Sequence, residues 1–176
     1  MWAEVLNRWV GPAKRVLATG RSHSDKRVTI SNKLEDSTVP DSLAIIADLE
    51  CGATASYHFS TSTSCGPGSS IEIYGSRGTL IYTLFKEEIM GASAGQNQLA
   101  TIPIPPDMER KQTTDSEFVK AIISGTHVSP DFEEGTKYME FSEAVAISLD
   151  TGSAVSIPPS PTMDAWGSPL NLQDSK

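Results

Sequence analysis

Apolar residues recur along the chain with two different periods. Between residues 53 and 60, Ala55, Tyr57 and Phe59 alternate with polar residues. A period of two is typical of a strand with one face on a core and one face polar. Between residues 132 and 149, the apolar positions are instead spaced at three to four residues, as on one face of an α-helix. The pattern therefore predicts strands in the first part of the chain and helices in the second.

The other elements follow from the same patterns and from their turn residues. Helices are expected over residues 1–9, between Thr114 and Gly125, and over residues 132–149. The expected strands are 14–19, 27–30, 43–49, 53–60, 71–74, 79–82, 84–89, 99–104 and 154–157. Strands grouped before helices indicate an α+β fold, in which the helices cover the apolar face of an antiparallel sheet.

Two of these strands flank a four-residue turn, and together they read SSIEIYGSRGTLIY over residues 69–82. Glycine tolerates the positive φ that a tight reversal needs, and the turn contains Gly75 and Gly78. This stretch therefore predicts a β-hairpin.

Composition narrows the class of protein and its partners. The chain has 176 residues, 38% of them hydrophobic, and a formal net charge of −8. An acidic chain is a poor nonspecific ligand for nucleic acid, which needs clustered Lys and Arg. No run approaches the roughly 18 consecutive apolar residues of a membrane span. We expect one domain over residues 1–157, in which residues 1–11 are the end of an incoming helix, and a disordered Pro/Ser-rich tail over residues 158–176.

Two cysteines, Cys51 and Cys65, allow one bridge but make no disulfide framework. The N-terminus lacks the basic and then apolar pattern of a signal peptide. Free thiols in a cytoplasmic protein are the favoured interpretation.

Few residues suggest chemistry by themselves. Neither GxGxxG nor GxxxxGK[ST] is present, and the spacing of the histidines and cysteines fits no metal motif. His58 lies on the polar side of a predicted strand, where it could transfer a proton or shape an interface, although a plain surface histidine is favoured. The acidic run from Asp131 to Glu134 is better explained as helix N-terminal charge than as a catalytic pair.

The motifs IEIYGSRGTL and FVKAIISG, the latter followed by SPDFEEGTKYMEFSEAV, resemble the C-terminal domain of the glucose–fructose oxidoreductase/inositol dehydrogenase (Gfo/Idh/MocA) family. The resemblance covers residues 8–158. It implies an open, mostly antiparallel sheet with helices on one face and an oligomer interface on the other. It also implies a full-length enzyme in which a separate Rossmann domain binds NAD(P) and carries a catalytic lysine. The substrates it implies are small sugars, polyols and related compounds.

The chain departs from this family in ways that bear on activity. It contains no Rossmann half, so we expect it to bind no cofactor by itself. The His and Asp that many members carry on the first helix correspond to Trp2 and Val5, which cannot transfer a proton. No catalytic residue is therefore predicted.

The resemblance also suggests candidates for contact with a substrate. The loop before the hairpin gives Thr63, Ser64 and Cys65, and His58 is a fourth candidate because of its own place on the polar side of a predicted strand.

Three hypotheses follow from the sequence. The chain is the substrate-binding and oligomerisation half of such an oxidoreductase and depends on a Rossmann partner. Alternatively, it is a non-enzymatic oligomerisation or regulatory module, or the stray product of a wrong gene model. A homo-oligomer through the open sheet face is expected under the first two.

Overall fold

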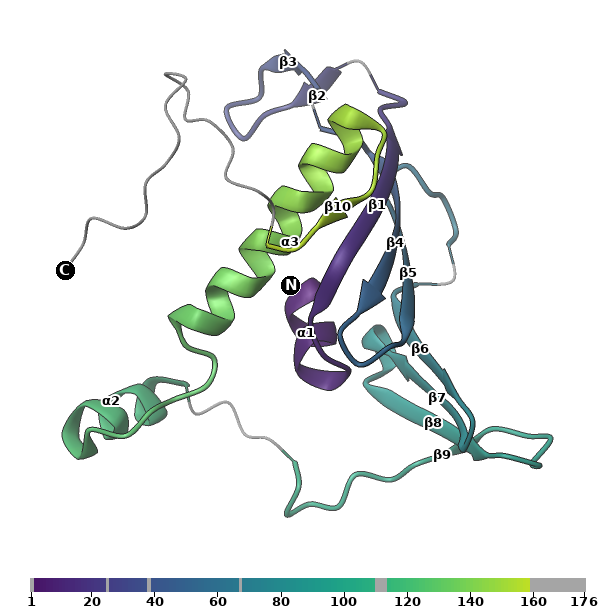
Figure 1. Cartoon of the computed structure of the whole chain (residues 1–176), viewed down its shortest axis with the longest axis vertical. Helices are drawn as coiled ribbons and strands as arrows, with labels where there is room; N and C mark the ends of the chain where they lie inside the picture. Colours follow the sequence, from purple (N-terminus) through teal and green to yellow (C-terminus); the bar gives the residue numbers. More distant parts are fainter. Residues whose placement is uncertain (1, 25, 38, 67, 110–113, 159–176) are drawn as a thin grey trace. The chain divides into compact units, whose positions relative to one another are not determined.

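The computed structural model describes residues 2–24, 26–37, 39–66, 68–109 and 114–158, so the predicted tail lies almost wholly outside the described residues. The fold is α+β with antiparallel sheets, as predicted (Figure 1). The helices are α1 (Trp2–Trp9), η1 (Leu84–Lys86), α2 (Thr114–Ser124) and α3 (Phe132–Thr151). The strands are β1 (Ala13–Arg21), β2 (Lys26–Val28), β3 (Leu34–Asp36), β4 (Ser42–Leu49), β5 (Thr54–Ser60), β6 (Ser70–Gly75), β7 (Gly78–Thr83), β8 (Glu88–Ser93), β9 (Ala100–Thr101) and β10 (Val155–Ser156).

The chain divides into two compact units, and each is described by itself. The first contains residues 1–62 and the chain from residue 121 onward, and the second contains residues 63–120. The expected domain bounds of 1–157 stay a prediction. Within the described part of the chain, no helix is long and apolar enough to cross a membrane.

The first unit is a four-stranded sheet in the order β10-β1-β4-β5, with every pairing antiparallel. Helix α3 runs along β1, and α1 lies on the same side of the sheet (Figure 1). The other side of this sheet is called the outer face below. One-sided coverage by helices is the arrangement that the sequence indicated.

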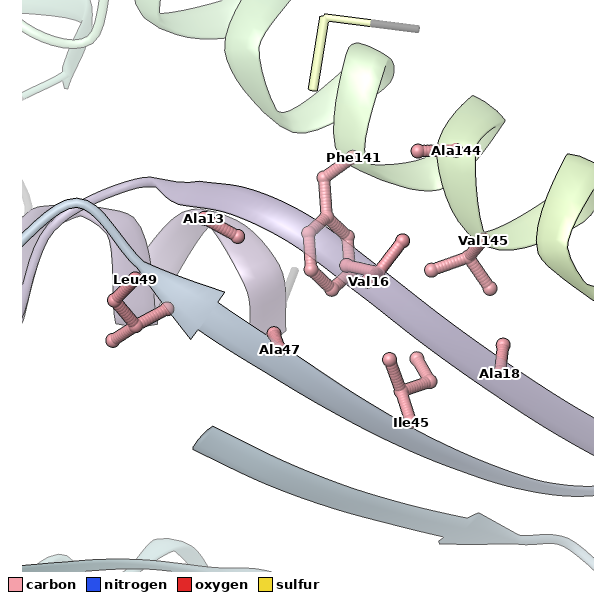
Figure 2. Close-up of a cluster of buried hydrophobic side chains, with 9 residues drawn as sticks. All are labelled: Ala13, Val16, Ala18, Ile45, Ala47, Leu49, Phe141, Ala144 and Val145. Carbon is pink, nitrogen blue, oxygen red and sulfur yellow. The ribbon is translucent and has the colours of Figure 1, made fainter. Parts of the chain in front are cut away.

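The core lies between α3 and the covered side of the sheet. Figure 2 shows Phe141 and Val145 pointing from α3 toward the strands. Every buried hydrophobic residue that the structure describes belongs to this cluster, namely Ala13, Val16, Ala18, Ile45, Ala47, Leu49, Phe141, Ala144 and Val145. Four of the nine are alanines, which let the helix backbone approach the sheet closely.

A β-bulge in β1 determines which of its side chains face the core. Ala13 pairs with Leu49 and Arg15 with Asp48, so Lys14 is the extra residue. Because a bulge changes the alternation of side chains, Ala13 and Val16 are both buried although they are three residues apart.

Ser148 connects α3, the sheet and the chain that follows the helix. Its side chain is fully buried; its Oγ accepts the N–H of Ala18 at 2.8 Å and donates to the carbonyl of Ser153 at 2.7 Å. Strand β10 pairs with β1 only at Arg15 and Val16, so Ser148 supplies an acceptor to Ala18 just beyond the end of that pairing. One hydroxyl therefore satisfies two backbone groups.

Both ends of α3 are capped. Asp131 is the N-cap and accepts the N–H of Glu134, while the Glu134 carboxylate accepts the N–H of Asp131, which makes a capping box. Gly152 ends the helix in the left-handed conformation at φ 63°. The acidic run thus has the helix-terminal role that the sequence favoured.

The second unit is a four-stranded antiparallel sheet in the order β6-β7-β8-β9. The predicted hairpin is confirmed, because β6 and β7 pair from Ser70 opposite Thr83 to Gly75 opposite Gly78. Of the two turn glycines, Gly78 has the positive φ. A Cβ on Gly78 would lie 2.2 Å from the carbonyl oxygen of Ala92 on β8, so this position requires glycine.

Some boundaries differ from the sequence prediction. The strand expected at 84–89 is the turn η1 followed by β8, which extends to Ser93 into a segment expected to be a turn. Gly91 lies inside β8 because the side chains of Leu80 and Ile102 occupy the space beside it. The strand expected at 27–30 is β2, and its partner β3 was not predicted.

Tyr57 closes the core at β5. Its ring lies 5.5 Å from that of Phe141 and 6.0 Å from that of Phe59, measured between centroids. Burial raises the pKa of the Tyr57 hydroxyl to about 12, because a phenolate is poorly solvated there.

Replacing Ser148 by alanine is expected to destabilise the first unit. The Ala18 N–H would remain buried without its acceptor, which costs about 1–3 kcal/mol of unfolding free energy. Urea unfolding followed by circular dichroism measures this change. Ser142→Ala is the matched control, since Ser142 is exposed on the same helix and donates only to the Tyr138 carbonyl. Equal stability of the two variants would contradict the proposed role of Ser148.

Alkaline pH is expected to destabilise the protein through Tyr57. The folded pKa lies above the unfolded value of 10.0, so this contribution is complete below pH 10 and is lost as the pH rises toward 12. Urea unfolding between pH 8 and 12 should therefore show a steeper loss of stability in the wild type than in Tyr57→Phe. Parallel pH profiles would show that the Tyr57 hydroxyl is not involved.

Candidate functional site

The outer face of the first sheet has an apolar centre that no described helix covers. Leu17 on β1 lies opposite Ile46 on β4, and Ile46 lies opposite Ser56 on β5. Leu17 is 44% exposed and Ile46 is 56% exposed. Beside them, Arg15 and Asp48 form an ion pair at 2.7 Å. An exposed apolar centre with a charged margin is typical of an interaction surface.

His58 also lies on this outer face, opposite Ala44. It is exposed, and the structure gives it no hydrogen-bond or ion-pair partner among the described residues. A general base needs a partner that orients its ring, so the geometry favours a surface or interface role.

The other predicted contacts to a substrate lie in the second unit. Thr63, Ser64 and Cys65 form an exposed loop before β6, and Cys65 adopts a left-handed conformation at φ 58°. Both cysteines are free. Because His58 belongs to the first unit, the four candidates do not form one site within either unit.

Trp2 and Val5, the positions compared with catalytic residues of the family, lie half-buried on α1. Neither side chain can transfer a proton. In the chain that the structure describes, no group of three or more His, Cys, Asp or Glu residues could hold a metal ion.

A small cleft lies between α1 and the N-terminal turns of α3, entirely within the first unit. Its volume is about 120 Å³, and Pro12 and Pro130 provide apolar surface. The polar lining residues are Glu4, Asn7 and Arg8 from α1 with Glu134 and Lys137 from α3. Sequence reasoning missed this cleft, because the two helices are about 120 residues apart in the chain; the only local signal was the spacing of Glu4 and Arg8.

Ion pairs and hydrogen bonds order the residues of the cleft. Arg8 Nε lies 2.7 Å from Glu4 Oε1, one helical turn away. The Glu134 carboxylate accepts the Ser129 hydroxyl at 2.8 Å in addition to the N–H of Asp131. Lys137 is held more loosely, with its Nζ 3.8 Å from Glu133.

The N-cap carboxylate of α3, Asp131, is stabilised in its ionised form. The N–H of Glu134 lowers the pKa of the Asp131 carboxyl, and the neighbouring His127 lowers it further. Asp131 therefore remains an ionised N-cap until the pH falls below the usual range for aspartate.

One buried carboxylate stands apart from the cleft. Asp41 is 6% exposed, and its Oδ2 accepts the backbone N–H groups of His23 and Ser24. Its Oδ1 is buried and has no partner among the residues described. Asp41 thereby holds the loop after β1 against the start of β4.

The described part of the chain contains no parallel pair of strands. Every strand pairing is antiparallel, whereas dinucleotide sites use a glycine-rich turn between a parallel strand and a helix. The described helices and strands do not form such a unit.

Comparisons with solved structures show the same fold in several oxidoreductases. Levoglucosan dehydrogenase, in a complex with NADH and L-sorbose, matches with a TM-score of 0.74 and 20% identity, over 89% of this chain and 48% of that one. An oxidoreductase domain protein from Kribbella flavida matches with a TM-score of 0.70 and 18% identity, over 89% and 48% of the two chains. An NAD binding oxidoreductase from Klebsiella pneumoniae matches with a TM-score of 0.70 and 16% identity, over 88% and 47%.

The chain thus spans about half the length of the solved oxidoreductases that it matches. No curated protein matches its sequence significantly. A model of the GFO/IDH/MocA C-terminal domain matches residues 3–81, which contain α1, the first sheet through β5 and most of the hairpin. Residues 3–81 are therefore similar to the C-terminal domain of the Gfo/Idh/MocA family, and the chain shares the fold of these solved oxidoreductases.

Proposed function

We propose that this chain is the substrate-binding and oligomerisation half of an NAD(P)-dependent oxidoreductase acting on sugar-like or polyol substrates. The observation that carries the proposal is the extent of the structural match, which covers 89% of this chain but only 48% of levoglucosan dehydrogenase. A chain that matches one half of a dehydrogenase almost throughout fits a role as that half.

The cofactor would be held by a Rossmann partner, since the described strands include no parallel pair of the kind that a dinucleotide site uses. That partner would supply NAD(P), which accepts or donates hydride at a carbinol carbon. This chain would contribute substrate contacts, for which Thr63, Ser64, Cys65 and His58 stay candidates. Two exposed free thiols and the acidic charge are compatible with a cytoplasmic setting.

Helix α2 supports the existence of a partner. Phe118 and Ile122 are 64% and 68% exposed and lie one turn apart on the same side of the helix, and the neighbouring Ile123 is 80% exposed. Large apolar residues exposed together on a helix are typical of a surface that another chain or domain covers.

The alternative is a non-enzymatic oligomerisation or regulatory module. It is favoured by Trp2 and Val5, which leave α1 without a proton carrier, and by the apolar centre of the outer face. The genomic sequence upstream of the first codon separates the two functions. An in-frame strand, GxGxxG turn and helix would favour the enzyme half. The absence of such a segment would favour the non-enzymatic module.

The isolated chain is expected not to bind nicotinamide cofactors. Titration with NADH or NADPH should leave the nicotinamide fluorescence unchanged up to about 1 mM, the limit of specific weak binding. A saturable enhancement at micromolar concentration would overturn the claim that the cofactor is held by a partner.

The outer face is expected to join copies of the chain. Light scattering should give the mass of a dimer or a larger assembly, and Ile46→Asp should give a monomer, because burying an unpaired carboxylate in an interface is strongly unfavourable. Val28→Asp is the matched control, since Val28 is 65% exposed on β2, away from the outer face. A monomeric wild type, or an Ile46→Asp variant that remains assembled, would contradict assembly through this face.

A further inference from the structure

The outer face of the first sheet has a charge pattern unlike that of the chain as a whole. Every second residue of β1, β4 and β5 points to this side, and three of these described positions are charged, namely Arg15, Arg21 and Asp48. Two arginines and one aspartate give these positions a formal charge of +1, whereas the whole chain carries −8. The bulge residue beside them, Lys14, is also basic. Two copies can therefore meet through this face without the repulsion between acidic surfaces that most of the chain would cause.

We propose that two copies of this chain pack outer face to outer face about a two-fold axis that runs along the strands, between β1 and β4, so that Arg15 of each copy meets Asp48 of the other. The inference rests on the proposed function for the assembly of copies. It goes further by naming which residues meet, and why a second copy is the partner that fits.

The strand order places the centre of the sheet between β1 and β4. The order is β10-β1-β4-β5, so one strand flanks this central pair on either side. A two-fold rotation about an axis along the strands at this centre places β1 of one copy over β4 of the other. It also keeps every residue at its own level along the strands. Residues that lie opposite each other within the sheet therefore become residues that face each other between copies.

This rotation makes the apolar centre of the face complementary to itself. Leu17 lies opposite Ile46 within the sheet, so each Leu17 would meet Ile46 of the other copy. Both side chains are exposed in the single chain, and their contact would remove apolar surface from water. The same rotation places Thr19 over Ala44 and Arg21 over Ser42. None of these contacts brings like charges together.

The ion pair has the capacity to bind its counterpart in the second copy. Arg15 approaches Asp48 Oδ2 with its Nε at 3.0 Å and its Nη2 at 2.7 Å. A guanidinium has five N–H donors and a carboxylate has two acceptor oxygens, so both groups keep unused positions. Their side chains are 59% and 35% exposed, so both can be reached from outside. Two such pairs brought face to face would form a network in which positive and negative groups alternate.

An axis across the strands would not fit the same charges. At the middle of β1, such an axis would place β1 over β1 with its two ends exchanged, so Arg15 would meet Arg21 of the other copy. Like charges that face each other across an interface are unfavourable. The positions of the three charged residues therefore favour the axis along the strands.

Reversing the two charges separately tests this arrangement. Arg15→Asp would leave two carboxylates where the ion pair stands, and Asp48→Arg would leave two guanidinium groups. Each variant alone should raise the dissociation constant of the dimer about tenfold or more, because like charges then face each other between copies. A mixture of the two variants should form a heterodimer of nearly wild-type affinity. Native mass spectrometry of the full chains distinguishes this heterodimer from both homodimers by its mass.

The matched control reverses an ion pair that lies away from the outer face. Glu133 and Lys137 form such a pair on α3, with 3.8 Å between nitrogen and oxygen. Glu133→Lys and Lys137→Glu should leave the dissociation constant unchanged, and their mixture should contain heterodimers only in the statistical proportion. Exposed ion pairs contribute little to folding, so thermal unfolding followed by circular dichroism should show that all four variants are folded.

A second pair of variants does not depend on the natural ion pair. Thr19→Lys and Ala44→Glu place opposite charges on separate chains, at positions that face each other only between copies. Their mixture should contain more heterodimer than the statistical proportion. This test remains available if either reversal of the ion pair unfolds the chain.

The possible failures can be told apart. Homodimers of unchanged affinity after charge reversal, or mixtures with only the statistical proportion of heterodimer, would refute this arrangement and leave assembly through the outer face intact. A wild type that is monomeric would refute the assembly and this arrangement with it. Dehydrogenase activity restored by adding a Rossmann half would support the enzyme role whatever the arrangement of the copies.

Discussion

The close contact between α3 and β1 is the interaction on which the first unit depends. Ala144 and Ser148 are both fully buried at this contact, and the Ser148 hydroxyl replaces a strand as hydrogen-bond partner for Ala18. A larger side chain at either position would move the helix away from the sheet and expose the alanines beneath it. The fold therefore tolerates a buried polar atom because this atom satisfies two backbone groups that would otherwise be unpaired.

The position of α3 in turn determines what the two sides of the sheet can do. Because α3 lies along β1, its N-terminal turns reach α1 and form the cleft lined by Arg8 and Lys137. The opposite side of the same sheet keeps Leu17 and Ile46 exposed. The two sides of one sheet thus differ, since one side is buried under α3 and the other presents exposed apolar side chains.

Periodicity predicted much of this fold, because its signals are local. The alternation around Tyr57 and the capped, apolar stripe of α3 each depend on residues close in sequence. The role of Ser148 could not be predicted in this way, since a serine in a helix looks polar and exposed until its partners on β1 and in the following loop are known. The bulge at Lys14 and the cleft could not be predicted for the same reason, because both depend on contacts between segments that are distant in sequence. The loop from Thr63 to Cys65 was proposed from resemblance and His58 from the polar side of its strand, and the structure places the loop and His58 in different units.

The separation of the two surfaces has a consequence for how the chain could act. The cleft lies on the helix-covered side of the first sheet, and the apolar centre of the outer face lies on the other side. Association of copies through the outer face would therefore leave the cleft accessible. The two sides of this one sheet are thus available for different contacts.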